Sequence, residues 1–124
     1  MNPETRIQNT ALLAVGADPD VLALRLQSGQ FRAMEDPQRI VKVGVPGLAD
    51  TMVFVRTVVT PEMVGKTIML PAAGEVKTPN GRQSESQVNF QKSWEARGGV
   101  YRLIRCAADM INLVHDVKTG KAFR

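Results

Sequence analysis

The chain has 124 residues, which suits one domain built around one hydrophobic core. Its 44% hydrophobic and 23% charged residues exclude a disordered or fibrous protein, and no apolar run approaches the roughly 20 residues that a transmembrane helix needs. The formal net charge of +4 suits a polyanionic partner but does not identify one.

The N-terminal residues and the cysteine content predict a cytoplasmic protein. Residues 1–4 lack the basic patch and apolar stretch of a signal peptide. Cys106 is the only cysteine, so no internal disulfide can form, as expected in a reducing compartment. His115 is the only histidine, which excludes a histidine metal cluster and a histidine-based catalytic triad.

The first part of the chain predicts one helix followed by short strands. Residues 3–15 are expected to be helical, because Pro3 suits the first helical position and apolar residues recur along one face. Residues 21–26 and 30–34 predict two short strands around a turn at Ser28-Gly29, a hairpin-like pattern in which the two strands are expected to pair with each other.

A long antiparallel hairpin is the central structural prediction. Residues 51–59 and 67–76 are both rich in β-branched and apolar residues, with a Pro- and Gly-punctuated turn between them. If the two runs fold about Glu62-Met63, Asp50 lies opposite Glu75. Two carboxylates that are distant in the sequence then become neighbours.

The remaining residues predict a helix, a strand and a last helix. Ser84 and Gln87 have the spacing of a capping box, and Gly98-Gly99 is expected to end that helix at about Arg97. Residues 100–105 predict a strand, and residues 107–117 predict the last helix.

The order of these elements predicts an α/β fold, a sandwich with one central mixed β-sheet that contains the long hairpin and is flanked by helices. We expect a single domain over residues 1–117, followed by a basic C-terminal tail at residues 118–124.

Glu75, Val76 and Lys77 form the group best suited to chemistry. On a strand, Glu75 and Lys77 point to one face while Val76 points into the core. Two carboxylates, Asp50 and Glu75, and the main-chain carbonyl of Val76 are hard oxygen ligands of the kind that Mg²⁺ or Mn²⁺ prefers. An amine beside them, that of Lys77, stabilises charge on a phosphate or helps to deprotonate a water molecule. The alternative interpretation is a cross-strand salt bridge on a solvated face.

Several blocks of the sequence follow one another in a characteristic order and spacing. They are Glu4, Leu24-Arg25, Ser28-Gly29 with Phe31, residues 43–50, 59–66, 75–82 and 84–87, and Gly98-Gly99. Together these blocks resemble the virus-type replication-repair nuclease (VRR-NUC) domain, a branch of the PD-(D/E)xK superfamily, in its stand-alone phage and prophage form. The chain departs from the pattern at Ala49, where the superfamily has proline, and at Ala73-Gly74, where bulkier residues are expected.

This resemblance implies a restriction-endonuclease-like sandwich and a Mg²⁺- or Mn²⁺-dependent endonuclease. Its members look like homodimers that act on branched DNA such as four-way (Holliday) junctions. Carried over to this chain, the resemblance implies metal ligation by Glu4, Asp50 and Glu75, a catalytic role for Lys77, and support of the site by Gln87. Two of these residues also have simpler interpretations, Glu4 as an acid at a helix N-terminus and Gln87 as the capping-box partner of Ser84.

Four basic residues are candidates for binding the DNA backbone: Arg25, Arg82, Lys118 and Lys121. For Arg25 and Arg82, an exposed, solvated side chain is an equally good interpretation. For Lys118 and Lys121, the alternative is a disordered basic end. Two rival functions also stay open, a catalytically inactive nucleic-acid-binding module of the same fold and a structural protein whose charged strand is only a salt-bridge ladder.

Overall fold

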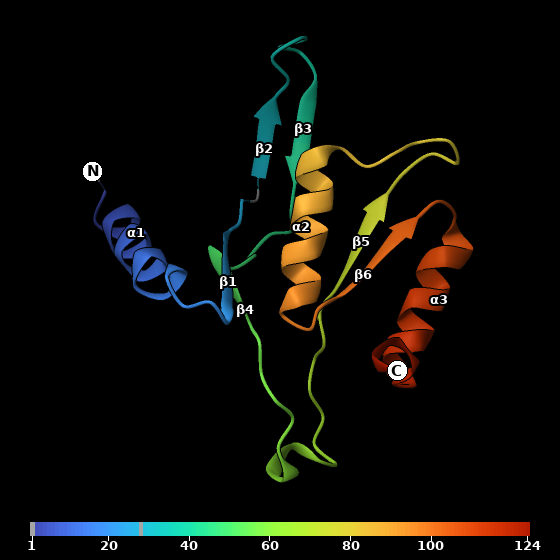
Figure 1. Cartoon of the computed structure of the whole chain (residues 1–124). Helices are drawn as coiled ribbons and strands as arrows, with labels where there is room; N and C mark the ends of the chain where they lie inside the picture. The colour runs from blue at the N-terminus through green and yellow to red at the C-terminus, as the bar shows by residue number, and fades with distance from the viewer. Residues whose placement is uncertain (1, 28) are drawn as a thin grey trace. The chain divides into compact units, whose positions relative to one another are not determined.

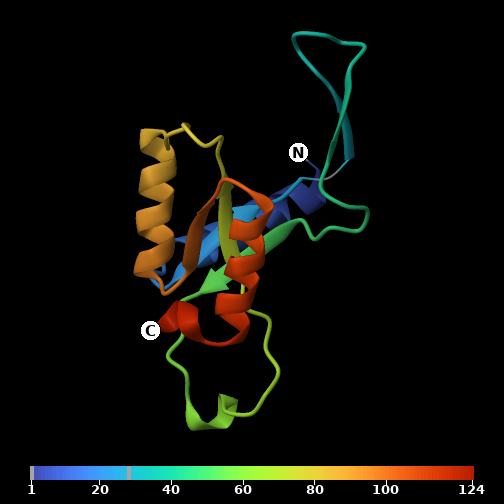
Figure 2. The ribbon, with the colours of Figure 1, turned by 90° about the vertical axis from the view of Figure 1, so that its right-hand side faces the viewer.

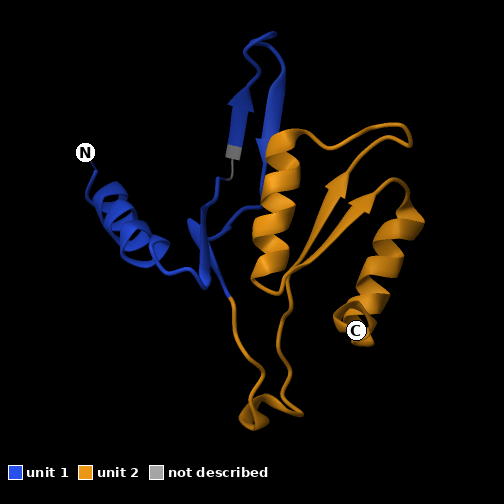
Figure 3. Cartoon of the chain, in the orientation of Figure 1, with its two compact units in different colours: residues 1–55 blue, residues 56–124 orange. Residues whose placement is uncertain are grey.

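The computed structural model describes residues 2–27 and 29–124, which form a mixed α/β fold (Figure 1). The elements in chain order are α1 (Pro3–Gly16), β1 (Val21–Arg25), β2 (Gly29–Arg32), β3 (Ile40–Val43), β4 (Thr51–Val55), the 3-10 helix η1 (Pro61–Met63), β5 (Ala72–Val76), α2 (Glu85–Ala96), β6 (Val100–Ile104), α3 (Ala107–Lys118) and the 3-10 helix η2 (Lys121–Phe123). The chain divides into two compact units, unit 1 (Met1–Val55) and unit 2 (Arg56–Arg124), which are coloured separately in Figure 3.

Unit 1 begins with the predicted first helix. The side chain of Asn2 accepts a hydrogen bond from the backbone N–H of Glu4 at 2.7 Å and so caps α1. Pro3 occupies the first turn, where its missing N–H costs nothing. The helix expected over residues 3–15 is therefore confirmed.

The strands of unit 1 pair differently from the sequence prediction. β1 pairs antiparallel with β4, from Val21↔Val55 to Arg25↔Thr51, and β2 pairs antiparallel with β3. The expected pairing of the first two strands with each other is wrong, because the turn around Asp36 closes a hairpin between β2 and β3. There the Asp36 carbonyl accepts from Arg39 N at 2.9 Å. Ser28, in the predicted turn, lies outside the described residues.

The prediction of a long antiparallel hairpin over residues 51–59 and 67–76 is also wrong for the described residues. Among the described residues β4 has β1 as its ladder partner and β5 has β6, and both strands are shorter than expected. Pro61 starts η1, and Gly65 has a φ of 81°, so the chain between β4 and β5 takes turns instead of extending the strands. Asp50 belongs to unit 1 and Glu75 to unit 2. Their juxtaposition therefore stays a prediction.

Unit 2 is built on a β5–α2–β6 crossover. β5 and β6 run parallel, in a register from Ala72↔Val100 to Val76↔Ile104. Parallel neighbours need a long connection, and α2 provides it. Within this unit the two strands lie between α2 and α3, which cover opposite faces of the strand pair (Figure 2).

Helix α2 begins and ends where the sequence predicts. The Ser84 hydroxyl accepts from Gln87 N at 3.2 Å, while Gln87 Oε1 accepts from Ser84 N at 2.9 Å, which completes the capping box. At the other end Gly98 has a φ of 87°, a left-handed conformation that glycine adopts without strain.

The core of unit 2 lies between the strand pair and α3. It contains Val100, Ile104 and Leu113, with Val117 and Ala122 packed against them. Residues 118–124, expected to be a basic tail, thus include the end of α3 and a residue that packs on the core. No helix in the described part of the chain is both long and apolar enough to cross a membrane.

Gly74 explains one departure from the expected strand pattern. A Cβ atom at this position would lie 3.1 Å from Ile104 Cγ1 and 3.3 Å from Met110 Cε. The strand therefore approaches its neighbours closely at the residue before Glu75, and a bulkier side chain would have to displace them.

Candidate functional site

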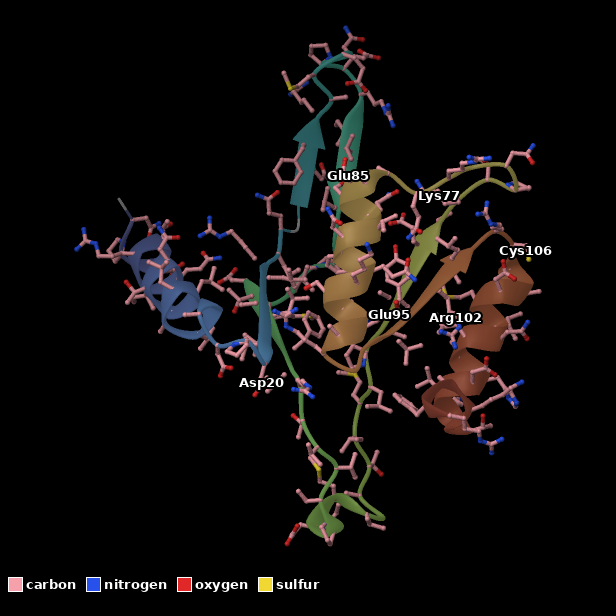
Figure 4. The ribbon with its side chains drawn as sticks, viewed as in Figure 1. Asp20, Lys77, Glu85, Glu95, Arg102 and Cys106 are labelled. Carbon is pink, nitrogen blue, oxygen red and sulfur yellow. The ribbon has the colours of Figure 1, made fainter. Side chains whose placement is uncertain are left out.

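Glu75 and Lys77 share one face at the carboxyl end of β5. From Ala72 to Lys77 exposed and half-buried residues alternate, and both charged residues fall in the half-buried set. The ladder continues through Lys77, whose backbone N–H donates to the Ile104 carbonyl at 3.0 Å. Figure 4 shows Lys77 at this end of the strand. The prediction that the two side chains share a face is confirmed.

The face that carries Glu75 and Lys77 is the one toward α2. Tyr101 of β6 donates a hydrogen bond to Glu75 and also lies 6.4 Å, between ring centroids, from Phe90 of α2. Val76 points to the other face and is 69% exposed, so its expected place in the core is wrong. The core contacts of that face come from Val100 and Ile104 of β6.

The main-chain carbonyl of Val76 points away from β6. The peptide bond between Val76 and Lys77 is trans, so its C=O and N–H point in opposite directions. Because the N–H of Lys77 is directed at Ile104, the carbonyl of Val76 is directed at the other side of β5. In the two-stranded ladder of unit 2, this is the side without a neighbouring strand.

Glu75 receives a hydrogen bond from a network that the sequence does not reveal. The Tyr101 hydroxyl donates to Glu75 Oε1 at 3.4 Å. Gln83 Nε2 donates to the Tyr101 oxygen at 3.2 Å and to Gln91 Oε1 at 2.9 Å. Only the parallel register, which pairs Tyr101 with Ala73, puts the tyrosine on the face of Glu75. No spacing in the sequence indicates that register.

Burial raises the pKa of the Tyr101 phenol above its ordinary value of 10.0, because the charged form loses hydration. The hydrogen bond from Gln83 acts in the opposite direction, and the negative charge of Glu75 adds to the rise. The phenol therefore stays protonated over the physiological range and can donate its hydrogen to Glu75.

The amine of Lys77 forms no ion pair with Glu75 or with any other carboxylate among residues 2–27 and 29–124. The salt bridge that is the alternative interpretation of this pair is therefore not found in this part of the chain. An amine without a carboxylate partner keeps its positive charge available for a bound anion.

The side-chain oxygen of Gln87 acts in the capping box, which is the simpler of the two roles predicted for this residue. Its Oε1 is used in the capping box of α2. Its amide Nε2 has no partner among the residues described, and the side chain is half-buried in the first turn of the helix. Gln87 therefore keeps a donor group for a ligand.

The turn after Lys77 is held by an arginine that sequence reasoning missed. Arg105 Nη1 donates to the carbonyls of Thr78 at 2.6 Å, Pro79 at 3.1 Å and Gly81 at 2.9 Å. Arg82, a predicted DNA-binding residue, follows this turn with an exposed side chain. Arg105 thus fixes the backbone between Lys77 and Arg82.

In unit 1, two of the predicted site residues lie at the same end of the β1–β4 ladder. Arg25 pairs in register with Thr51, and the carbonyl of the preceding residue, Asp50, accepts from Leu26 N at 2.8 Å. The Asp50 side chain is exposed. The guanidinium of Arg25 donates to Asn9 Oδ1 of α1, which orients it.

Glu4 lies in the first turn of α1 with an exposed side chain, which is the simpler role that the sequence allows it. Lys118 is the last residue of α3, and Lys121 begins η2.

The described residues contain no cluster of three or more histidine, cysteine, aspartate and glutamate side chains close enough to hold a metal ion. Within unit 2, the structure places two oxygen ligands for a metal ion at the end of β5, the carboxylate of Glu75 and the main-chain carbonyl of Val76.

The chemistry of this donor set fits Mg²⁺ or Mn²⁺. Carboxylate and carbonyl oxygens are the hard ligands that these ions prefer. Comparison of the chain with models of protein families, with curated proteins and with solved structures gives no match.

Proposed function

We propose that this protein is a Mg²⁺- or Mn²⁺-dependent, structure-selective DNA endonuclease of the restriction-endonuclease-like fold. Its substrate would be branched DNA, such as a four-way junction. One observation carries the proposal. At the end of β5 a carboxylate, Glu75, and an amine without a carboxylate partner, Lys77, share a half-buried face beside the outward carbonyl of Val76.

The carboxylates of Glu4, Asp50 and Glu75 and the carbonyl of Val76 would hold the divalent ion. When bound, such an ion polarises a phosphoryl oxygen and makes a coordinated water molecule a better nucleophile. Glu4 and Asp50 come to this set through the resemblance to the VRR-NUC domain, whereas Glu75 and Val76 are also supported by their geometry.

Lys77 would act on the scissile phosphate. Its positive charge stabilises the negative charge that develops on the phosphate oxygens when the phosphodiester bond breaks. Because the side chain is half-buried, this attraction is screened less than it would be in open water. The free amide nitrogen of Gln87 adds a donor on the same side of the strand pair.

Arg25, Arg82, Lys118 and Lys121 would bind backbone phosphates, which fix the position of the DNA without reading its sequence. Unit 2 has eleven lysines and arginines against six aspartates and glutamates, so its formal charge is +5 and favours a polyanion. A homodimer would match the two equivalent strands of a symmetric junction.

The direct test incubates the purified protein with four-way junctions, flaps and plain duplex in Mg²⁺, Mn²⁺ or a chelator. We expect cleavage of the branched substrates that requires the metal and is lost in Glu75→Gln. The exposed Glu85→Gln on α2 is the matched control and should cleave normally. Binding of junctions without cleavage under any metal would instead support the inactive nucleic-acid-binding module.

A further inference from the structure

A buried tyrosine hydroxyl lies directly beside the Glu75 carboxylate. Tyr101 is only 4% exposed, and its oxygen lies 3.4 Å from Glu75 Oε1 and 3.2 Å from Gln83 Nε2. Leaving a buried hydroxyl without hydrogen-bond partners costs free energy. The two polar side chains beside the Tyr101 hydroxyl therefore define its position. The neighbouring ring of Phe90 limits the movement of the phenol ring.

Gln83 fixes the direction of these hydrogen bonds. Its Nε2 carries only donor hydrogens, and the structure directs it to both Gln91 Oε1 and the Tyr101 oxygen. The Tyr101 oxygen is therefore an acceptor toward Gln83, and its single hydrogen is available only for Glu75. Each group donates to the next, and the chain of donors ends at the carboxylate.

We propose that Tyr101 is a positioning residue that holds the Glu75 carboxylate in the orientation in which it binds the divalent ion. This inference rests on the proposed function, because it requires Glu75 to be a metal ligand. Tyr101 engages Oε1, and unit 2 offers no hydrogen-bond donor to Oε2 among its described residues. Oε2 is thus the oxygen left for the cation, and a ligand held in place by such a partner binds more tightly than a freely rotating one.

The test compares four forms of the full chain: wild type, Tyr101→Phe, Glu75→Gln and Ile104→Val. Calorimetric titration with Mn²⁺ alone measures ion binding without any DNA. Cleavage of a four-way junction at increasing Mn²⁺ gives the concentration needed for half-maximal rate. We expect Tyr101→Phe to bind Mn²⁺ about tenfold or more weakly, and Glu75→Gln to lose binding.

A positioning role also predicts how Tyr101→Phe responds to excess metal. Its half-maximal Mn²⁺ concentration for cleavage should rise by the same factor as its dissociation constant, while the rate at saturating Mn²⁺ returns close to that of wild type. Gln83→Met leaves both Tyr101 and Glu75 in place and removes only the donor behind the hydroxyl. It should weaken Mn²⁺ binding in the same direction, and it tests the proposal even if Tyr101→Phe folds poorly.

Ile104→Val is the matched control for lost stability. Ile104 packs with Val100 and Leu113 in the core toward α3, on the face opposite Glu75, so it should lower the melting temperature without changing Mn²⁺ binding. Two results would overturn the positioning role but not the proposed function. One is that Tyr101→Phe and Gln83→Met bind Mn²⁺ as tightly as wild type, and the other is that Ile104→Val weakens Mn²⁺ binding as much as they do. A folded wild type that binds no Mn²⁺ and cleaves no junction would overturn the proposed function with it.

Discussion

Lys77 holds a positive charge in a position that stability does not explain. Its side chain is half-buried, and its amine forms no ion pair with a carboxylate among the described residues, so none of these carboxylates neutralises its charge. Its neighbour on the same face, Glu75, is instead hydrogen-bonded by Tyr101. A phosphate group is the natural partner of such an amine.

Replacing Lys77 with methionine tests this interpretation. Lys77→Met keeps the aliphatic stem and removes the charge, so we expect the melting temperature to change little. Cleavage of a four-way junction should slow by about a hundredfold or more, because charge stabilisation in the transition state is lost. Single-turnover kinetics measure the rate. The exposed Lys92→Met on α2 is the control and should cleave at the wild-type rate, and normal cleavage by Lys77→Met would contradict the assigned role.

Tyr101 predicts a pH dependence of stability above pH 10. Its pKa is raised in the folded protein, so the unfolded chain releases the phenol proton first as the pH rises. The stabilisation from the protonated phenol is complete below the ordinary pKa of 10.0 and is lost as the pH rises through the folded value. Urea unfolding between pH 8 and about pH 11.5 should therefore show a decline in the free energy of unfolding that is smaller in Tyr101→Phe. Parallel curves for the two proteins would contradict this prediction.

At the scale of elements, the end of α2 depends on two adjacent glycines, Gly98 and Gly99, which have different structural roles. Gly98 takes the left-handed conformation with a φ of 87°. A Cβ atom on Gly99 would lie 2.8 Å from Cε2 of Trp94, whose Nε1 donates to the Val100 carbonyl at 2.8 Å. The second glycine therefore makes room for the indole ring that joins α2 to β6.

Gly99→Ala should displace that indole ring. We expect the free energy of unfolding to fall by about 1–3 kcal/mol and the fluorescence of Trp94, the only tryptophan, to change. Gly98→Ala is the paired variant, because it strains the backbone without meeting any neighbouring atom. It should lose stability but keep the native Trp94 fluorescence. Unchanged stability and fluorescence in Gly99→Ala would count against the close approach.

Both ends of α2 could be predicted from the sequence, because Ser84, Gln87 and Gly98 act on the backbone within a few residues. Strand partners could not be predicted in this way, since the partner of β5 is decided by contacts with residues far along the chain. The same apolar pattern suits both an antiparallel hairpin and the observed parallel pair, in which Val76 is exposed. Gly74, which breaks the strand pattern, is explained only once Ile104 and Met110 are seen beside it.

For the whole molecule, the sequence could predict only the part of the candidate site that depends on the local geometry of one strand. Strand alternation alone places Glu75 and Lys77 on one face. Tyr101 and Arg105 were missed because they reach Glu75 and the turn after Lys77 from β6 and its end, through tertiary contacts. The described residues do not form the hairpin that would place Asp50 opposite Glu75, so the part of Asp50 in the site is a prediction that rests on the resemblance to the VRR-NUC domain.

The central proposal, which includes Asp50 through the resemblance to the VRR-NUC domain, is that Asp50 and Glu75 bind the same divalent ion, and paramagnetic broadening tests it most directly. Uniformly ¹⁵N-labelled protein is titrated with substoichiometric Mn²⁺, and amide signals are compared before and after addition of a chelator. The proposed site predicts that the signals of residues around Asp50 and around Glu75 broaden together, and that Glu75→Gln abolishes both effects. Broadening confined to one of the two segments, or spread evenly over exposed carboxylates, would contradict the claim.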